Sequence, residues 1–358
     1  MRLLPDDDER EFTSMLRRLL SAGTEPSALW ASLADAGVLG LTLPEQYGGS
    51  GADLTALGAF CVEAGRALCP TIVHGTLHAG LAVHTFGTAE QHAALLPPLA
   101  DGRCRATTAL WSPVDAGDVT PALQAAYGSN TWLLNGLVDF VLDAPTADLV
   151  VVSAKDVVTG RTLAFVVSTD ASGVHTEPLT LMGGQGAAAL RFDNVSVEDS
   201  LLVLGGDDGI PDDRLRRLAN TASALLSLDL VGVGEAALQR TVDHTVMREQ
   251  FGRPIASFQA AQHLVANMHI ALSAARLAAW AAVSLLGDGH TATRQTAVAR
   301  MHAAAAAKLA TLDAHQLHGG MGYVVDTDLH RYSERARVLS TLGGGADIAA
   351  TWLQGADA

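Results

Sequence analysis

Three long helical runs after Pro211 constrain the fold of this chain more than any other feature of its sequence. The runs cover residues 213–248, 257–286 and 291–317, and short segments containing Gly or Pro separate them. Alanine and leucine dominate the chain, which favours helix over strand. Long helices joined by short turns are typical of a bundle, so the sequence predicts a helical bundle over residues 211–358.

The middle of the chain has the composition of β-strands. Asn135-Gly136 lies between two apolar runs, which is a short-range signal for a hairpin turn. Three further strand-like runs are 148–153, 162–168 and 188–195. The sequence therefore predicts a compact β-domain in this region.

The N-terminal part of the chain has a helical pattern. Leu29, Trp30 and Leu33 recur at helical spacing, and a glycine-rich loop at 44–51 precedes another helical run at 53–67. We therefore expect an α+β fold that is mainly α, with three domains: an N-terminal helical domain (1–104), a middle β-domain (105–210) and a C-terminal helical bundle (211–358).

Charge and cysteine content exclude several functions. The formal net charge of −15 argues against nucleic acid and against anionic membrane surfaces as partners. Cys61, Cys69 and Cys104 lack the spacing of metal ligands, and their odd number argues against a disulfide framework. We expect no metal site.

Two observations bear on localisation. Residues 1–8 contain no apolar segment of the kind that a secretory signal needs. The most apolar stretch, 270–286, carries Arg276 and is predicted to be a buried bundle helix rather than a membrane span. The sequence predicts a soluble, cytoplasmic protein.

Motifs spread over nearly the whole chain carry a family resemblance. Two are highly specific: Met247-Arg-Glu-Gln-Phe-Gly-Arg-Pro-Ile, with Phe258-Gln-Ala-Ala-Gln-His after it, and Gln316-Leu-His-Gly-Gly-Met-Gly-Tyr. Residues 39–51, 86–91 and 95–102 add further matches in the same order. In this order and spacing the motifs resemble those of the acyl-CoA dehydrogenases, a family of flavoproteins.

The resemblance implies a fold, a cofactor and an assembly. The fold is the acyl-CoA dehydrogenase fold, with an N-terminal helical domain, a middle β-domain and a C-terminal four-helix bundle. The cofactor is FAD and the assembly is a tetramer in which each FAD lies across two subunits. The middle domain of one subunit holds the flavin ring, and the bundle of its neighbour holds the pyrophosphate and adenine.

The motifs retain the adenine and pyrophosphate half of this site. Arg248 would bind the pyrophosphate, because a planar, permanently charged guanidinium suits phosphate. Gly319 and Gly320 lack a Cβ and would let the backbone approach a flat ligand. The cofactor-binding set that the resemblance implies is Arg248, Gln250, Phe251, Gln259, Gln316, Gly319 and Gly320. Taken singly, Arg248 could equally be a solvated cation at a helix end, and the glycine pair a helix C-cap.

The catalytic base of the family is missing. The reaction needs a carboxylate that removes the α-proton of the thioester, a flavin that accepts a hydride from the β-carbon, and hydrogen bonds to the thioester carbonyl. The family usually carries the base, a Glu, in a loop after the Gly-Gly motif, where this chain has Gly343. Some relatives carry it on an earlier bundle helix, at a position that matches Ala222. We therefore predict no catalytic residue in this chain.

Two flavin-contacting motifs have also changed. The family's Trp-Ile-Thr is Phe140-Val141-Leu142 here, which removes a hydroxyl that would bond the flavin. Trp111 stands where a small hydroxyl residue approaches the ring, and Val114 replaces a glycine. The added bulk is predicted to fill a pocket rather than line one.

An emptied flavin face and an intact adenine face indicate a subunit that completes the active site of another chain. The chain resembles the base-lacking subunit of bacterial α2β2 acyl-CoA dehydrogenases that act on steroid side-chain CoA thioesters. The implied partner is a paralogous Glu-bearing subunit that holds the acyl-CoA, and an electron-transfer flavoprotein is a candidate electron acceptor.

Two alternatives stay open. One is an active homotetrameric acyl-CoA dehydrogenase whose base is displaced to a nearby titratable residue: Asp326, Asp328, His330, Glu334 or Asp347. The other is a structural or regulatory relative that binds no flavin.

Overall fold

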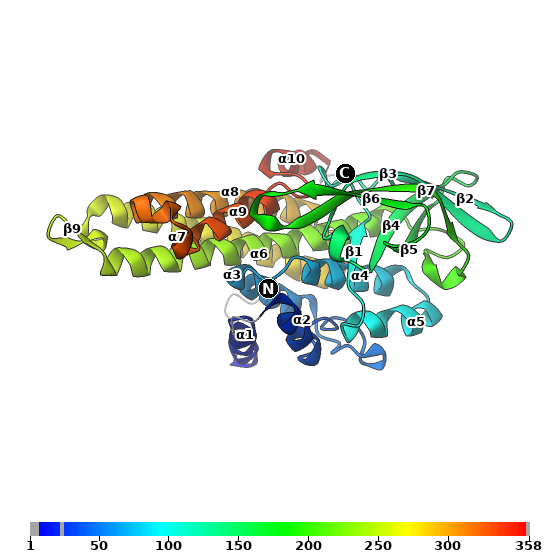
Figure 1. Cartoon of the computed structure of the whole chain (residues 1–358), viewed down its shortest axis with the longest axis horizontal. Helices are drawn as coiled ribbons and strands as arrows, with labels where there is room; N and C mark the ends of the chain where they lie inside the picture. Colours follow the sequence, from blue (N-terminus) through cyan, green and yellow to red (C-terminus); the bar gives the residue numbers. More distant parts are fainter. Residues whose placement is uncertain (1–6, 22–24, 356–358) are drawn as a thin grey trace. The chain divides into compact units, whose positions relative to one another are not determined.

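The computed structural model describes residues 7–21 and 25–355 (Figure 1). Residues 1–6, which are part of the argument against a secretory signal, lie outside this range. The described residues form two compact units. The first contains residues 7–21, 58–69 and 223–355, and the second contains residues 25–57 and 70–222. The predicted three-domain division follows the order of the elements instead, and it stays a prediction.

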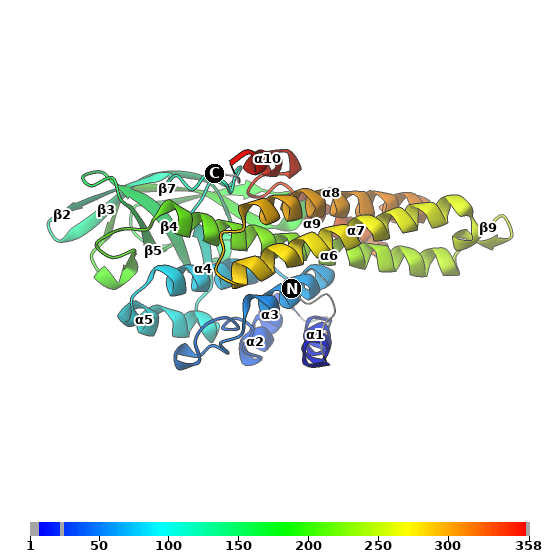
Figure 2. The ribbon, with the colours of Figure 1, turned by 180° about the vertical axis from the view of Figure 1, so that it is seen from behind.

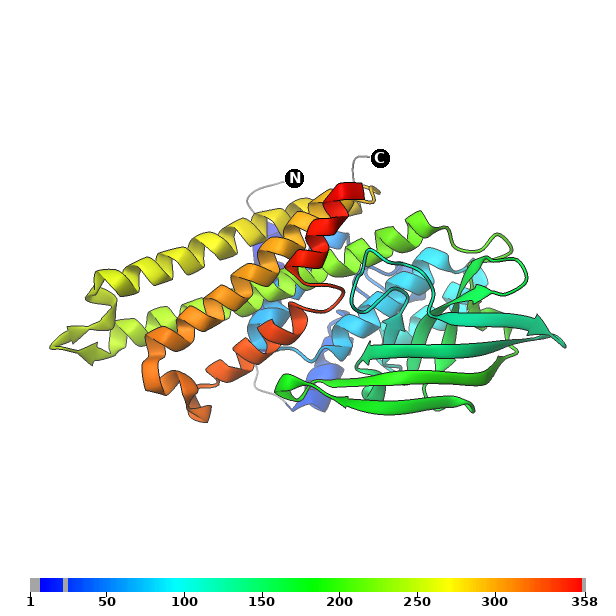
Figure 3. The same cartoon turned by 90° about the horizontal axis from the view of Figure 1, so that it is seen from above.

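The second unit combines helices with one eight-stranded sheet (Figure 3). Its helices are α2 (Pro26–Asp35), α4 (Ile72–Phe86) and α5 (Ala89–Ala100). Its strands are β1 (Ala106–Ala109), β2 (Leu123–Gly128), β3 (Thr131–Leu142), β4 (Leu149–Asp156), β5 (Thr162–Ser168), β6 (Val174–Thr180), β7 (Gly186–Val197) and β8 (Val203–Leu204). The strand order is β6-β7-β3-β2-β4-β5-β8, and β1 pairs with β4 in addition. The pairs β1–β4 and β2–β4 are parallel, and the others are antiparallel.

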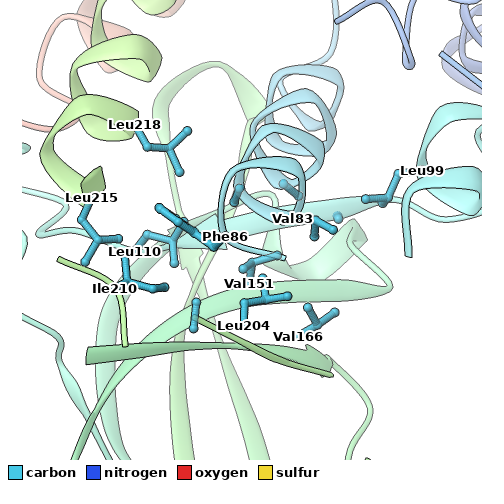
Figure 4. Packing of buried hydrophobic residues seen from close by; sticks show 14 of the residues in the cluster. Val83, Phe86, Leu99, Leu110, Val151, Val166, Leu204, Ile210, Leu215 and Leu218 are labelled. Atoms are coloured by element: carbon cyan, nitrogen blue, oxygen red, sulfur yellow. The ribbon is translucent and has the colours of Figure 1, made fainter. Parts of the chain in front are cut away.

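Strands β4 and β5 are buried on both faces, which explains their nearly continuous apolar sequences. Val151 and Val166 pack in one core cluster with residues of α4 and α5, whereas Val150 and Phe165 pack in a second cluster with residues of β3 and β7. Successive side chains of a strand point to opposite faces, so these two strands fill both clusters. Figure 4 shows the first cluster, in which Phe86 lies among side chains of the sheet and of the first turns of α6 (Asp212–Met247).

The predicted hairpin turn at Asn135-Gly136 is wrong. Both residues lie inside β3, where the pairing with β7 shifts register and Gly136 has a φ of 140°. The Asn135 side chain accepts a hydrogen bond from the amide of Asn194 (2.9 Å), so it serves this bulge rather than a turn. The hairpin turns at Ser129-Asn130, whose φ values of 54° and 62° are those of a two-residue turn matched to the twist of a hairpin.

The first unit is built mainly from α-helices (Figures 1 and 2). Its elements are α1 (Asp7–Leu20), α3 (Leu54–Ala67) from residue 58, α6 from residue 223, β9 (Glu249–Gln250), β10 (Arg253–Pro254), α7 (Gln259–Gly287), α8 (Thr293–His318), α9 (Leu329–Leu339) and α10 (Ala346–Thr351). The bounds of α6, α7 and α8 differ by one or two residues from the predicted runs, which is ordinary scatter at helix ends. The predicted helical bundle is confirmed.

Helices α3 and α6 approach each other closely through a glycine on each. A Cβ on Gly65 would lie 2.0 Å from the carbonyl oxygen of Asp229, and one on Gly232 would lie 2.0 Å from that of Val62. No side chain fits at such distances, so both positions require glycine for packing. This contact holds α6 against α3, and α6 continues from there to its C-terminal end at Met247, directly before Arg248.

Helices α6 and α7 are long and apolar enough to cross a membrane by length and composition alone. In α6, 78% of the apolar window is buried inside the protein, as in the core helix of a soluble protein. In α7 the buried share is 33%, and Ile270 and Leu277 are 65% and 50% exposed. The prediction of a buried helix at 270–286 is therefore wrong for one face, because α7 packs on its unit along one side only. On that packed side Arg276 donates to both carboxylate oxygens of Glu235 in α6 at 2.8 Å.

Candidate functional site

Helix α6 ends in a tight hairpin that carries three of the predicted cofactor-binding residues. The Arg248 amide donates to the carbonyl oxygen of His244 (2.8 Å), and the Arg248 carbonyl accepts from the amide of Ile255 (2.9 Å). Strands β9 and β10 pair Gln250 with Arg253 across the turn. The backbone of this segment is thus fixed, while the side chains of Arg248 and Gln250 are exposed.

The turn of this hairpin is Phe251-Gly252, and both residues are left-handed, with φ values of 55° and 76°. A left-handed conformation costs an ordinary residue about 1–2 kcal/mol. Phe251 is also 93% exposed, with its ring centroid 6.2 Å from that of Phe258 in an edge-on contact. A strained backbone that presents a large apolar ring to water is typical of a binding site. Gln259, exposed at the start of α7, follows directly.

The end of α8 carries the remaining predicted residues. Gly319 is the C-cap of α8, with a φ of 58°, and its amide donates to the carbonyl oxygen of Gln316. A Cβ on Gly322 would lie 2.9 Å from the carbonyl oxygen of His315, so packing requires that glycine. A Cβ on Gly319 or Gly320 would meet no described atom within 4 Å. The backbone at these two glycines is therefore open to a ligand, and the Gln316 side chain beside them is exposed.

The structure brings the two segments together through a pair of histidines that the sequence analysis did not identify. His244, one helical turn before Arg248, stacks on His318, which directly precedes Gly319. The ring centroids are 4.3 Å apart, and the planes differ by 19°. Both histidines adjoin a recognised motif, but nothing in the sequence pairs residues of α6 with residues of α8.

The local environment lowers the pKa of both imidazoles, which favours their neutral form. Burial lowers the pKa of His244, and the neighbouring His318 and Arg248 lower it further. Burial is also the main cause that lowers the pKa of His318, with smaller effects from His315 and Arg240. The Nδ1 of His318 lies 2.7 Å from the carbonyl oxygen of Ala314, which raises this pKa in part. The ring therefore donates through Nδ1 to this carbonyl, and in the neutral imidazole Nε2 is then the acceptor.

The residues at these two helix ends fit the phosphate and adenine end of a dinucleotide. Arg248 offers a guanidinium for phosphate, and Gln250 and Gln316 offer amide groups for a polar ring edge. The bare backbone of Gly319-Gly320 admits a flat group. Because the side chains are exposed, a second surface is needed to enclose the ligand.

The loop at the predicted base position has a backbone that favours glycine. Residues 340–346 read Ser-Thr-Leu-Gly-Gly-Gly-Ala and contain no acid. Gly343 and Gly344 have φ values of 63° and 97°, a region that side-chain-bearing residues rarely adopt. The loop thus contains no carboxylate, and its backbone favours glycine at Gly343 and Gly344.

Arg300 of α8 holds this loop from inside the unit. It is 1% exposed, and its guanidinium donates to the carbonyl oxygens of Leu339 (2.6 Å), Leu342 (2.6 Å) and Gly344 (3.2 Å). Leu339 is the last residue of α9, so the cation also meets the negative end of that helix dipole. Burial lowers the pKa of Arg300 to about 10, which leaves it charged at neutral pH.

The alternative base position is also empty. Ala222 is 7% exposed in α6, between Thr221 and Ser223. The next acid along α6 is Asp229, which is fully buried, and Arg335 of α9 donates to both of its oxygens at 3.1 and 2.6 Å. A carboxylate held in this bidentate pair is structural, because accepting a proton would break the pair.

Three altered positions of the predicted flavin face lie in the second unit. Trp111 packs against the core cluster of Figure 4, so its indole occupies space where a small residue would leave room. Leu142 ends β3, and its carbonyl accepts a hydrogen bond from Thr107 Oγ1 (2.7 Å), but its side chain offers no hydroxyl. Val114 is 72% exposed, so the prediction that it fills a pocket is wrong: its loop carries it into solvent.

The candidates for a displaced base are spread over the end of the first unit. Asp347 is exposed in the first turn of α10, and Glu334 is half-buried on α9. Asp328 lies 3.7 Å from Arg331 in an exposed ion pair. The Nδ1 atom of His330 is buried without a partner among the described residues. None of these positions has a contact that distinguishes it as a base.

The described helices, sheet and long-helix bundle occur together in a known family of dehydrogenases. Residues 9–103 match the model of the acyl-CoA dehydrogenase N-terminal domain, and residues 216–354 match that of the acyl-CoA dehydrogenase C-terminal domain. The chain belongs to the acyl-CoA dehydrogenase family, whose cofactor is FAD.

Individual relatives extend over almost the full chain. An acyl-CoA dehydrogenase of Bacillus subtilis (strain 168) is 30% identical and is matched over 90% of this chain and 87% of its own. A variant of the Tcur3481-Tcur3483 steroid ACAD is 32% identical, with a TM-score of 0.86 over 98% of this chain and 99% of its own. The ChsE4-ChsE5 complex from Mycobacterium tuberculosis is 27% identical, with a TM-score of 0.86 over 99% and 97% of the two chains.

Proposed function

We propose that this chain is the base-lacking subunit of a heteromeric, FAD-dependent acyl-CoA dehydrogenase. The observation that carries the proposal is the contrast between two segments of the first unit. The loop at Gly343 has no acid and has two left-handed glycines, whereas Arg248 and Gly319-Gly320 present an accessible half-site for a dinucleotide. A chain with only the second segment can contribute to cofactor binding but has no base for proton abstraction.

The separate roles of this chain and its partner follow from their side chains. FAD, when bound, supplies the acceptor for a hydride from the β-carbon of the acyl thioester. Arg248 would neutralise and orient the pyrophosphate, while Gln250 and Gln316 would bond polar edges of the nucleotide. Removal of the α-proton requires a carboxylate, which in this arrangement belongs to the Glu-bearing partner. The acyl-CoA is therefore bound at the partner's site.

Exposed apolar side chains support a partner subunit. Phe251 and Tyr323, at the two ends that form the half-site, are 93% and 80% exposed, and Ile270 and Leu277 on α7 are 65% and 50% exposed. Burying a large apolar side chain stabilises by about 1.5–3 kcal/mol, so these residues favour association over a free chain. A second subunit would also supply the surface that encloses the cofactor.

The proposed acyl group is a steroid side chain carried as a CoA thioester. Two similar structures support this choice: one is a steroid ACAD with two named components, and the other is a complex of two named chains. An electron-transfer flavoprotein is the proposed electron acceptor, as the family's chemistry needs a one- or two-electron carrier to reoxidise the flavin.

Coexpression with a Glu-bearing acyl-CoA dehydrogenase paralogue from the same organism tests the proposal. The complex is purified through a tag on this chain, and its FAD content and activity toward a panel of acyl-CoA thioesters, steroid side-chain thioesters included, are measured. We expect one FAD per heterodimer, little flavin in the chain alone, and activity that disappears when the partner's Glu is changed to Gln.

Two other outcomes would each replace the proposal. A yellow, active preparation of this chain alone, with one FAD per chain, would favour the displaced base, and loss of that activity in Asp347→Asn or Glu334→Gln would locate it. A stable complex that contains no flavin would favour the structural or regulatory relative.

A further inference from the structure

The His244–His318 stack is a direct contact between the two ends of the candidate half-site. Its rings are 4.3 Å apart between centroids and nearly parallel. His244 precedes Arg248 by one helical turn, and His318 directly precedes Gly319. A change in the stack therefore acts on the phosphate-binding arginine and on the open glycines at once.

Charged and titratable groups surround the stack. Arg248 of α6 acts on His244, and Arg240 of α6 and His315 of α8 act on His318. Tyr323, after α8, and Tyr332 of α9 contact two of these groups in turn. Arg240 lies over the Tyr332 ring at 5.1 Å and donates to the carbonyl oxygen of Thr327 (3.4 Å), and His315 stacks on Tyr323 at 5.2 Å.

Two acids, Asp243 and Asp313, lie close to the two histidines in sequence. Asp243, beside His244 in sequence, accepts a hydrogen bond from Gln239 (2.9 Å) on the same helix. Asp313 is partly buried, and burial raises the pKa of its carboxyl. The groups that act electrostatically on the two rings are cations or other histidines. A proton added to either ring therefore meets positive charge.

We propose that the His244–His318 stack is a pH-sensitive clamp, which at neutral pH holds the two helix ends in register for the phosphate and adenine end of a dinucleotide and which acidification opens. The identity of the ligand rests on the proposed function. The contact between the two histidine rings does not depend on it. The two histidines are positioning residues, because they act through the placement of Arg248 and Gly319-Gly320.

The sign of the effect follows from the direction of both pKa shifts. The imidazoles are neutral in the closed stack and have lowered pKa values, whereas an opened stack returns them toward the ordinary value near 6.5. The open form therefore binds protons more readily, and it gains population as the pH falls below about 6.5. Each unit of pH below that value shifts a one-proton equilibrium by up to about tenfold.

The test compares His244→Phe with wild type in the flavin-loaded heteromeric complex. Phenylalanine keeps a flat ring in the stack and removes the titrating nitrogens of His244, which leaves His318 as the one titrating ring of the pair. FAD release is followed by flavin fluorescence between pH 7.5 and 5.5. We expect the dissociation constant of wild type to rise about tenfold or more over this range, and that of His244→Phe to rise by a clearly smaller factor, because one of the two titrating rings is gone. His302→Phe, an exposed position on α8, should keep the wild-type profile.

A second readout needs no flavin. Amide hydrogen exchange at residues 314–322 of the isolated chain is compared between wild type and His244→Phe at the same pH. We expect equal protection at pH 7.5 and faster exchange in wild type at pH 5.5. Identical pH profiles of the two proteins in both readouts would overturn the clamp. A complex that never binds flavin, but shows the exchange difference, would instead overturn the proposed function and retain the clamp.

Discussion

The guanidinium of Arg300 donates to the carbonyl oxygen of Leu342 at 2.6 Å, and Leu342 directly precedes Gly343. The loop without a base is thus held by a buried cation of α8, which also reaches the last carbonyl of α9. Such a contact gives the loop a defined conformation without any ligand. It indicates that the loop has a structural role in this chain.

Arg300→Met should destabilise the protein by roughly 2–4 kcal/mol, because buried carbonyls lose their donor and α9 loses the cation at its end. Urea unfolding measures the change. Lys308→Met, an exposed position on the same helix, is the matched control and should change stability by less than about 0.5 kcal/mol. A loss below 1 kcal/mol for Arg300→Met would show that the loop does not depend on this contact.

Gly343→Glu should restore no dehydrogenase activity to the isolated chain, although it returns an acid to the expected position. The backbone at Gly343 is left-handed, so a side chain there costs about 1–2 kcal/mol and the loop must move to relieve it. Gly343→Ala measures this backbone cost. Gly345→Ala is its control, since Gly345 has a φ of −75° and a Cβ would make an ordinary contact. Acyl-CoA-dependent dye reduction by Gly343→Glu alone would contradict the prediction.

Arg248→Ala should weaken FAD binding by the heteromeric complex about 10- to 100-fold, the loss expected for a hydrogen-bonded charge contact. Arg248→Lys should fall between wild type and Arg248→Ala, because lysine keeps the charge but not the two-pronged geometry. Equilibrium dialysis with FAD measures both. Unchanged flavin content in Arg248→Ala would show that this exposed arginine is only a solvated helix-end cation.

His78→Leu should make the protein more resistant to acid. The Nε2 atom of His78 is buried without a partner among the described residues, and burial, with a smaller effect of His74, lowers the pKa of His78 to about 3. The unfolded chain takes up this proton near pH 6.5, so the neutral ring contributes stability above that pH, which is lost as the pH falls toward 3.

Unfolding in urea at pH 7.5 and at pH 5 measures this difference. His78→Leu should lose less stability between the two pH values than wild type does. His175→Leu, exposed on β6 of the same unit, should follow wild type. If His78→Leu and wild type lose equal stability, the histidine does not titrate as its burial implies.

Regular elements were the part of the fold that the sequence predicted well. Apolar periodicity placed α6, α7 and α8 within one or two residues, because each helix has an apolar face that must be buried. The prediction of the hairpin turn failed because the local pattern at Asn135-Gly136 is compatible with a turn and with a bulge. In this sheet the pairing with β7 uses those residues for a bulge, and Ser129-Asn130 makes the turn instead.

The candidate site was predictable only where a motif carried it. Arg248 and Gly319-Gly320 stood out as parts of recognised motifs, whereas the stack of His244 on His318 depends on how α6 and α8 lie against each other. The role of Arg300 was hidden for the same reason, because its hydrogen bonds reach carbonyls some forty residues away, which no spacing rule connects to it. The exposure of Val114 shows the converse error, in which residue size alone suggested a filled pocket.

The two left-handed glycines of the Gly343 loop also bear on the history of this chain. Once a backbone has settled into conformations that favour glycine, regaining an acid takes a change of loop geometry together with a change of residue. A single nucleotide substitution in the Gly343 codon is then an unproductive step, because the intermediate carries strain before it gains chemistry. In the proposed heteromeric enzyme this works as a ratchet: the chain stays dependent on whichever gene supplies the carboxylate, and the two genes are expected to be inherited and lost together.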